Sequence, residues 1–476
     1  MFTRGIRRAG FSPANGQGRA TFRGAGLAMA MILVAGACAS AVVTPTPTAS
    51  AAPTPTSPAS PTPSATPTPL PTDVPSPSPT SAAVVFATAL GKAKLLAPAA
   101  DGGTLAGTEL NAFGLDLLRS LDPTGNLSAS PTSIALALAM VRAGAVGTTA
   151  TEMDTVLHKF GTTGQASEVV ALLAALKAMT DAGKAPADEL DVANAVFSQT
   201  GMTLEQAYLD ALSSGFGAGV GLLDFQKDPE SGRLTINQWA SKATKGLIPA
   251  VLQPGDITNQ TRIALADAIY LKAAWETQFQ ATSTKSLPFT RPDGSKISVP
   301  TMAIDTSLQY GAGTGYRAVQ LSLKTSGSMT FIVPDNMASF TAGLTSAQLA
   351  SIESKFTAHS VNLTLPKFAT TSRFDLAKVL AAMGMPTAFS SNADLSGITL
   401  DEQLAIDHVI HQANVAIDER GVIAAAVTVV TGKATAGPPP SPVTFHIDKP
   451  FLFFIQERAT GAILFMGRID DPSAKS

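Results

Sequence analysis

The sequence predicts an α+β fold, and two observations lead to this prediction. Helical periodicity is concentrated in the first half of the globular region, whereas strand-like runs follow one another in the second half. Helices and strands do not alternate regularly, so the chain lacks the βαβ pattern of a parallel α/β sheet, and no internal repeat is visible. Segregated helices and strands favour large antiparallel or mixed sheets.

Helices are predicted where apolar residues recur with helical spacing. The first is identified by one apolar face, formed by Leu110, Phe113, Leu117, Leu118 and Leu121. Residues 133–146 are apolar on every side, which is typical of a helix buried at the centre of a domain. Further helices are predicted over residues 168–179 and 234–243.

Strands are predicted from short runs of apolar and β-branched residues. These runs cover residues 262–271, 318–323, 329–333, 360–365, 408–417, 443–447, 451–456 and 463–467. Because they are numerous and close together, we expect them to pair into sheets that the helices cover.

The first 37 residues resemble a secretory signal, because five arginines precede a short apolar run over residues 27–37. A spanning helix needs about 20 apolar residues, so this run is too short to be one. Residues 35–37 and the single cysteine, Cys38, resemble a bacterial lipobox, although Ala35 stands where leucine is commoner. We expect a lipoprotein-type signal peptide over residues 1–37 and lipid attachment at Cys38. The alternative is an ordinary signal peptide followed by an incidental cysteine.

Residues 44–80 consist almost entirely of Thr, Pro, Ser and Ala. Such a segment cannot bury a core and tends toward extended polyproline II. At about 3.1 Å per residue it reaches roughly 110 Å, which is enough to hold a domain well clear of a membrane. We therefore expect a disordered tether over residues 38–103 and one globular domain over residues 104–472.

Composition excludes two further features. With one cysteine the chain cannot form an intramolecular disulfide, so the domain depends on its hydrophobic core. Removal of residues 1–37 takes away five arginines and no acidic residue, which leaves 28 basic against 35 acidic side chains, a net charge of −7. Nucleic acid requires a clustered basic surface, and none is visible. No nucleic-acid partner is therefore expected.

No constellation of catalytic residues is visible. The sequence contains no Gly-x-Ser-x-Gly motif, no Walker motif and no dinucleotide-binding glycine pattern. His408 and His411 are three residues apart, which on a strand places their side chains on opposite faces, so we do not expect them to share a metal ion. The sequence predicts neither an enzyme nor a cofactor, and a cell-surface hydrolase is rejected.

The most informative segment is residues 418–428, with the sequence DERGVIAAAVT. Its small, uncharged residues after the glycine are compatible with a buried strand. The Gly/Pro tract over residues 432–442 is compatible only with a loop. A connection this long inside a domain is usually functional or disordered. The combination indicates a segment that can lie either inside a sheet or outside it.

This segment resembles the reactive-centre loop of the serpins, protease inhibitors whose loop inserts into a β-sheet after cleavage. Other motifs match the family in order between about Thr104 and Pro472: SPTSI at 130–134, ANAVF at 193–197, AIYLK at 268–272, LPKF at 365–368, ADLSG at 393–397, PFLF at 450–453 and LFMGR at 464–468. The resemblance implies a large mixed β-sheet, two smaller sheets, about eight or nine helices and an exposed reactive-centre loop.

The resemblance also assigns roles within the loop, residues 419–443. It places the reactive bond at Thr435–Ala436, with Ala434–Thr435 and Lys433–Ala434 as alternatives. The hinge consists of Glu419, Gly421, Val422, Ala424, Ala425, Ala426 and Thr428. On an inserted strand the uncharged side chains at positions 422, 424, 426 and 428 would face the core. The chain departs from the family at Val422, where threonine is commoner, and at Ile423, which replaces a usual glutamate.

A gate is expected where the sheet parts. The resemblance assigns it to Asn126, Ser130, Ser133, Asp267 and His411, with Trp275 near the point where the loop enters the sheet. The family usually has an asparagine at the position of Asp267. A carboxylate facing His411 would form a charge-assisted pair and make opening depend on pH. The competing interpretations are structural, because Ser130-Pro131 is also a good helix start and Trp275 also fits ordinary core packing.

The predicted function is suicide inhibition by a monomeric, lipid-anchored protein at the cell surface. Its expected partner is an extracellular serine protease. Small residues around Thr435 favour an elastase-like or subtilisin-like enzyme, whereas cleavage at Lys433 would favour a trypsin-like one. If Cys38 carries no lipid, the protein is instead secreted. The alternative function is that of a non-inhibitory serpin acting as a binding or scaffold protein.

Overall fold

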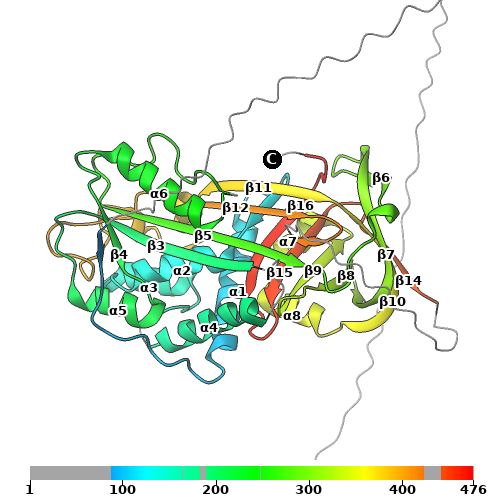
Figure 1. The fold of residues 1–476 in the computed structure, drawn as a ribbon, viewed down its shortest axis with the longest axis horizontal. Coiled ribbons are helices and arrows are strands. Elements are labelled where there is room, and N and C mark those ends of the chain that lie inside the picture. The colour runs from blue at the N-terminus through cyan, green and yellow to red at the C-terminus, as the bar shows by residue number, and fades with distance from the viewer. Residues whose placement is uncertain (1–86, 163, 183–188, 247, 423–440, 475–476) are drawn as a thin grey trace, which may run out of the picture. The chain divides into compact units, whose positions relative to one another are not determined.

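The structure, a computed structural model, describes residues 87–162, 164–182, 189–246, 248–422 and 441–474. The predicted signal peptide, Cys38 and the predicted reactive bond lie outside these ranges. Within them the chain forms nine α-helices and sixteen strands in mixed sheets, which confirms the predicted α+β class (Figure 1). No helix in the described ranges combines the length and apolarity needed to cross a bilayer.

The helices are α1 (Gly102–Ser120), α2 (Pro131–Arg142), α3 (Gly147–Val156), α4 (Ala166–Ala182), α5 (Gln206–Phe216), α6 (Pro229–Ala243), α7 (Met337–Gly343), α8 (Ser346–Glu353) and α9 (Ala377–Met383). Every residue of α2 except Arg142 is buried, which confirms the predicted central helix. Its first turn is stabilised by Ser130 Oγ, which accepts a hydrogen bond from Ser133 N at 3.2 Å. The helix ends at Arg142, earlier than predicted, and just after it Gly144 lies so close to Ile398 that a Cβ would be 2.2 Å from Ile398 Cγ1.

Seven described strands form the large sheet. In spatial order they are β1 (Ala87–Ala89), β4 (Val220–Leu223), β3 (Glu189–Gln199), β5 (Ile263–Ala274), β13 (Gly421–Val422), β12 (Ile410–Ile417) and β11 (Phe368–Asp375). The sheet is mixed, since β3 and β4 are parallel and the other neighbours are antiparallel.

The remaining strands form two smaller sheets that share one long strand. The shared strand is β7 (Lys296–Gly313). One sheet adds β6 (Lys285–Thr290), β10 (Thr357–Pro366) and β14 (Val443–His446). The other continues through β8 (Tyr316–Ser322), β9 (Gly327–Pro334), β15 (Phe451–Glu457), β16 (Ile463–Ile469) and β2 (Leu127–Ala129). The sequence does not predict β7, because exposed and covered residues mix along it and Pro300 lies within it.

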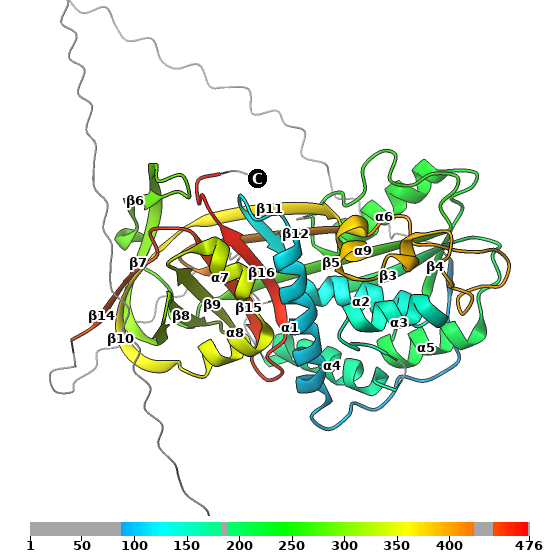
Figure 2. The same ribbon diagram turned by 180° about the vertical axis from the view of Figure 1, so that it is seen from behind.

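The large sheet is covered on both faces by separate apolar clusters. On β3, Val196 belongs to the main core and the next residue, Phe197, belongs to a second cluster beneath α6. On β5, Leu265 faces the main core, whereas Ala264 and Ala266 face the second cluster. This alternation is expected for strands, because successive side chains point to opposite faces of the sheet. The two views accordingly place α2 and α3 on one face and α6 on the other (Figures 1 and 2).

The folded domain begins ahead of residue 104, the boundary expected from the sequence. Strand β1 adds an edge to the large sheet by pairing with β4, for example Thr88 with Gly221. After it, the backbone N–H of Lys92 donates to Asp210 Oδ1 at 2.5 Å. Residues 87–101, which the sequence analysis assigned to the tether, therefore belong in the structure to the folded domain.

Candidate functional site

The hinge begins inside the large sheet. Strand β13 pairs with β5 through Gly421 and Ala274, and with β12 through Val422 and Ile417. Val422 is 1% exposed, so its side chain already lies in the core, on the side that the sequence analysis expected. At Gly421 a Cβ would lie 2.1 Å from the carbonyl oxygen of Ala273, which no packing adjustment would accommodate. Glycine is therefore required where the chain turns into the sheet.

An acidic turn connects β12 to β13. Asp418 Oδ1 accepts hydrogen bonds from the backbone N–H groups of Arg420 at 2.8 Å and Gly421 at 3.3 Å. The Arg420 guanidinium lies 2.8 Å from Asp418 Oδ2, and Asp418 N donates to Gly421 O at 3.0 Å. These bonds stabilise the turn and therefore fix the position at which the hinge enters the sheet.

Glu419 connects this turn to two other elements. Its carboxylate accepts from Lys367 Nζ at 2.9 Å and from Thr284 Oγ1 at 2.7 Å. The Glu419 side chain is 14% exposed. Burial raises the pKa of its carboxyl, but the hydrogen bonds from Lys367 and Thr284 outweigh burial and lower the pKa below its usual value. The carboxylate is thus ionised at neutral pH and fixes the start of the hinge to the body of the domain.

Trp275 lies directly against the acidic turn. It is fully buried, and its Nε1 donates to Asp418 O at 2.9 Å while its backbone N donates to Arg420 O at 2.8 Å. Phe279 packs edge-on against the indole at 6.2 Å, and its backbone N donates to Glu419 O at 2.9 Å. The tryptophan therefore packs in the core and also supports the backbone from which the hinge departs.

Three of the predicted gate residues meet beneath the sheet. Ser130 and Ser133 lie at the start of α2, and His411 lies on β12; all three are fully buried. The backbone N–H of Ser130 donates to His411 Nε2 at 3.0 Å, and Ser133 Oγ donates to Asn194 Oδ1 of β3 at 3.4 Å. Polar contacts therefore connect α2 to strands on both sides of the hinge.

Of the other two predicted gate residues, Asn126 bonds to different partners, and Asp267 is placed by its backbone alone. Asn126 binds the end of the chain: its Nδ2 donates to Asp471 O at 2.7 Å, and its Oδ1 accepts from Asp470 N at 2.8 Å. It thus fixes the connection before β2 to the segment after β16, and its role in the gate stays a prediction. The backbone of Asp267 is opposite Asn194 in the β3–β5 pair, but its side chain lies outside the described residues. Its pairing with His411 stays a prediction.

The two neighbouring histidines belong to separate networks. His408 precedes β12, and its Nδ1 lies 2.7 Å from Asp375 Oδ2, whereas His411 contacts the start of α2. In the ranges that the structure describes, no group of three or more candidate ligands is placed to hold a metal ion. The described part of the predicted site therefore consists of structural contacts around the hinge.

Four residues of this site have no role in the sequence analysis. They are Lys367 and Thr284, which bind Glu419; Asn194, which binds Ser133; and Ser128, whose Oγ donates to Ala413 O of β12 at 3.1 Å. The one available signal is that Asn194 is an amide with apolar neighbours on both sides in the ANAVF motif. The remaining hinge residues, Ala424, Ala425, Ala426 and Thr428, together with Thr435 and Ala436, lie outside the described ranges.

Comparison of the whole chain with known families and relatives gives one consistent result. A family model described as Serpin (serine protease inhibitor) matches residues 108–472. Leukocyte elastase inhibitor from Homo sapiens is 32% identical over 382 residues, which cover 76% of this chain and 97% of that protein. Iripin-8 from Ixodes ricinus is 35% identical over 376 residues, which cover 76% of this chain and 92% of that protein.

Solved structures give the same fold. Tengpin, a thermophilic serpin in its native state, matches with a TM-score of 0.72 over 81% of this chain and 99% of its own, and at 24% identity it supports the fold alone. Thyroxine-binding globulin in complex with thyroxine matches with a TM-score of 0.67 at 26% identity, over 78% of this chain and 100% of its own.

Proposed function

Because this chain belongs to the serpin family, which is described as serine protease inhibitors and not as enzymes, we propose that it is a suicide-type inhibitor of an extracellular serine protease. In this proposal the loop of residues 419–443 is cleaved and its hinge then inserts between β5 and β12. The observation that carries the proposal is the position of β13. Its two residues are antiparallel to both flanking strands, so a strand that continues from Val422 would extend an existing pairing on each side.

The chemistry begins with the protease. Its serine oxygen attacks the carbonyl of the residue before the reactive bond, the peptide C–N bond breaks, and the new amine leaves with a proton. The cleaved loop remains attached to the protease as an ester. If the hinge inserts before water hydrolyses that ester, the protease is carried along the sheet and its active site is distorted. Inhibition therefore depends on insertion being faster than deacylation.

The energy for insertion comes from the loop's own residues. Burial of a valine side chain stabilises the inserted form by about 1.5–3 kcal/mol. Each new strand hydrogen bond adds a net stabilisation of about 0.5–1.5 kcal/mol. Small uncharged residues follow Val422 in the sequence, so no buried charge opposes their entry. The contacts of Glu419 and Asp418 would keep the start of the new strand in place while the rest moves.

The proposed target is an elastase-like or subtilisin-like protease. Small residues at Thr435–Ala436 support it, as does similarity to proteins named leukocyte elastase inhibitor. Cleavage at Lys433 would direct the loop to a trypsin-like enzyme instead. We place the protein at the cell surface, held by lipid at Cys38, with residues 1–37 removed as a signal peptide. Metabolic labelling with a fatty acid tests this, with Cys38→Ser as the unlabelled control.

The alternative is a non-inhibitory serpin that binds or carries another molecule. The similarity to thyroxine-binding globulin is the observation that keeps it in view. A carrier differs from an inhibitor in one measurable respect, because a carrier needs no loop insertion.

One experiment separates the two functions. The mature protein is incubated with pancreatic elastase, subtilisin and trypsin in turn, and the products are examined on a denaturing gel. Inhibition predicts a covalent band that survives SDS, and a cleaved form that melts at a higher temperature than the intact form. Simple cleavage, with equal melting temperatures before and after, would support the carrier and contradict the inhibitor.

A further inference from the structure

The end of the large sheet opposite the hinge is held closed by a separate set of contacts. The hinge pairs with the last residues of β5, Ala273 and Ala274, whereas β5 begins at Ile263. At this beginning, residues of β5 and β12 line one cavity of only about 20 Å³, with Ile263 and Ala264 on one side and Ile410 on the other. A new strand would find no space here, so full-length insertion requires this end to open.

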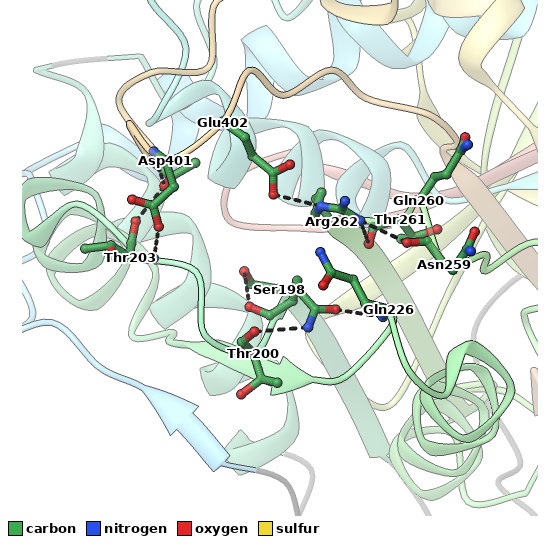
Figure 3. Close-up of polar contacts among 12 residues, drawn as sticks. Ser198, Thr200, Thr203, Gln226, Asn259, Gln260, Thr261, Arg262, Asp401 and Glu402 are labelled. Carbon is green, nitrogen blue, oxygen red and sulfur yellow. Dashed lines mark hydrogen bonds and ion pairs between the residues drawn. The ribbon is translucent and has the colours of Figure 1, made fainter.

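Residues 398–402 bind the strand ends on the β5 side, and we refer to them as the 398–402 segment. Arg262, immediately before β5, donates from Nε to Glu402 Oε1 at 2.7 Å (Figure 3). The backbone N–H of Thr203, in the turn after β3, donates to Asp401 Oδ2 at 2.6 Å. Thr203 O in turn accepts from Thr399 Oγ1 at 2.6 Å. Three side chains of this segment therefore fasten the ends of β3 and β5.

Two more contacts strengthen this connection. Glu205 N donates to Ile398 O at 2.9 Å, which adds a backbone bond between the turn after β3 and the 398–402 segment. On the strand side, Gln199 N donates to Arg262 O at 2.8 Å, so β3 and β5 are joined to each other at the same place. The two strand ends are therefore connected to the segment as one unit.

The same stretch of chain is also fixed to the helices under the sheet. Gly397 N donates to Gly144 O at 3.1 Å, and Val146 N donates to Asp394 O at 2.9 Å. Gly144 and Ile398 are in contact without space for a side chain on the glycine. The 398–402 segment thus connects the ends of β3 and β5 to the turn between α2 and α3, and it continues in sequence toward β12.

We propose that the 398–402 segment limits how far the cleaved loop inserts, and that the Arg262–Glu402 ion pair has to break before insertion is complete. This inference rests on the proposed inhibitory function. Neighbouring strands are about 4.8 Å apart, so a complete new strand moves β5 away from β12 by about that distance. If the segment stays with the helices, the 2.7 Å contact between Arg262 and Glu402 cannot survive the movement. Partial insertion near the hinge leaves it intact.

The ion pair is partly exposed, since the side chains of Arg262 and Glu402 are 24% and 40% accessible. Solvent-screened pairs of this kind contribute modestly. Removing one partner is therefore expected to accelerate complete insertion by about two- to fivefold. Faster insertion has two measurable consequences: fewer loops are cleaved per protease trapped, and the uncleaved protein converts to an inserted form sooner on warming. Arg262 and Glu402 are positioning residues in this scheme, because neither contacts the protease.

The test uses the mature full-length chain with Arg262→Gln, Glu402→Gln and the exchanged pair Arg262→Glu with Glu402→Arg. Lys449→Gln is the matched control, because Lys449 pairs with Asp335 at 3.5 Å on an exposed surface away from these strands. Each variant is measured for the number of inhibitor molecules consumed per elastase trapped and for the rate of conversion on warming. Urea unfolding of the intact form reports general destabilisation.

The proposal expects both single variants to convert faster and to lose urea stability by no more than the same two- to fivefold factor in the unfolding equilibrium, and the exchanged pair to return toward the wild-type rate. Rates equal to those of Lys449→Gln would overturn it, as would a loss of urea stability much larger than the acceleration, because the variant would then be destabilised in general. If the wild type traps elastase while the variants behave identically to it, this inference alone fails. If the wild type traps nothing and its cleaved form melts no higher than the intact form, the proposed function fails as well.

Discussion

Replacing Val422 with glutamate is the most direct test of the inserted hinge. Val422 is 1% exposed and lies between β5 and β12, so a carboxylate at this position would be buried without a partner in the pairing that the structure describes. The replacement leaves the reactive bond and the length of the loop unchanged. Because Val422 is already buried in the intact form, the glutamate is expected to draw β13 out of the sheet. Cleavage by the protease should then proceed normally, while insertion, which has to bury residue 422 again, becomes unfavourable.

The magnitude follows from the charge. A buried carboxyl with no partner avoids the cost of ionisation by taking up a proton. Protonating a glutamate of ordinary pKa at pH 7 costs about 4 kcal/mol, because each pH unit above the pKa adds about 1.4 kcal/mol. Loss of the valine's apolar burial adds about 1.5 kcal/mol or more. A barrier raised by the sum of the two costs, about 5.5 kcal/mol, slows insertion by roughly ten-thousandfold, so hydrolysis of the acyl-enzyme should prevail.

The assay is the denaturing gel with elastase, run beside the melting temperature of the cleaved product. Val422→Glu should give cleaved protein without a covalent band, and Val422→Ala should retain much of the trapping. Thr444→Glu is the matched control, since Thr444 is exposed on β14 at the other end of the loop. The cleaved Val422→Glu form should become more heat-stable between pH 8 and pH 5 as the carboxyl takes up a proton.

The reasoning would be refuted if Val422→Glu trapped elastase as efficiently as the wild type. In that case burial of residue 422 would not be required for inhibition. If Thr444→Glu also failed to trap elastase, the failure of Val422→Glu would show only that any added charge in the loop region interferes with inhibition.

Three further outcomes are expected. Lys367→Met removes a hydrogen-bond donor that lowers the pKa of Glu419. Because that pKa is lowered in the folded state, the Glu419 carboxylate stabilises the protein above about pH 4.5, and this stabilisation is lost as the pH falls. The acid dependence of unfolding, followed by circular dichroism, should therefore weaken in the variant. Ser130→Ala removes the cap bond to Ser133 and should lower the free energy of unfolding in urea by about 1 kcal/mol. Burial raises the pKa of Glu353 to about 6, so ionisation of this carboxyl destabilises the folded protein at neutral pH. Glu353→Gln should therefore stabilise the protein by about 1–2 kcal/mol at pH 7 and by little at pH 4. Urea unfolding midpoints at the two pH values measure this difference. A Glu353→Gln variant that is less stable at pH 7 would contradict this assignment.

Local sequence patterns predicted those parts of the fold whose cause is itself local. The buried helix α2 follows from a run that is apolar on every side, and its start follows from Ser130-Pro131, a cap and a first-turn proline. The hinge was predicted because glycine and small uncharged residues there are unusual in one segment. Strand β1 was assigned to the tether, because Ala87–Ala89 has no periodicity of its own and becomes a strand only by pairing with β4.

The side-chain partners were beyond the reach of such patterns. Lys367 and Glu419 are 52 residues apart, and Ser133 and Asn194 are 61 apart. Such pairs meet only because strand register and helix packing bring distant segments together. Asn126 shows the same limit: the family resemblance assigned it to the gate, but only the structure shows that its amide bonds to the backbone of residues 470 and 471.

The amino-acid sequence alone determined the family, the α+β class, the single central helix and the small, uncharged character of the hinge, because each depends on residue type and short spacing. The tertiary structure decided how the hinge is held and what restrains the far end of the sheet. Contacts such as Glu419 with Lys367 and Arg262 with Glu402 depend on distances across the folded chain. A one-dimensional pattern contains residue spacing along the chain, but the energy of a hydrogen bond or ion pair depends on separation in space.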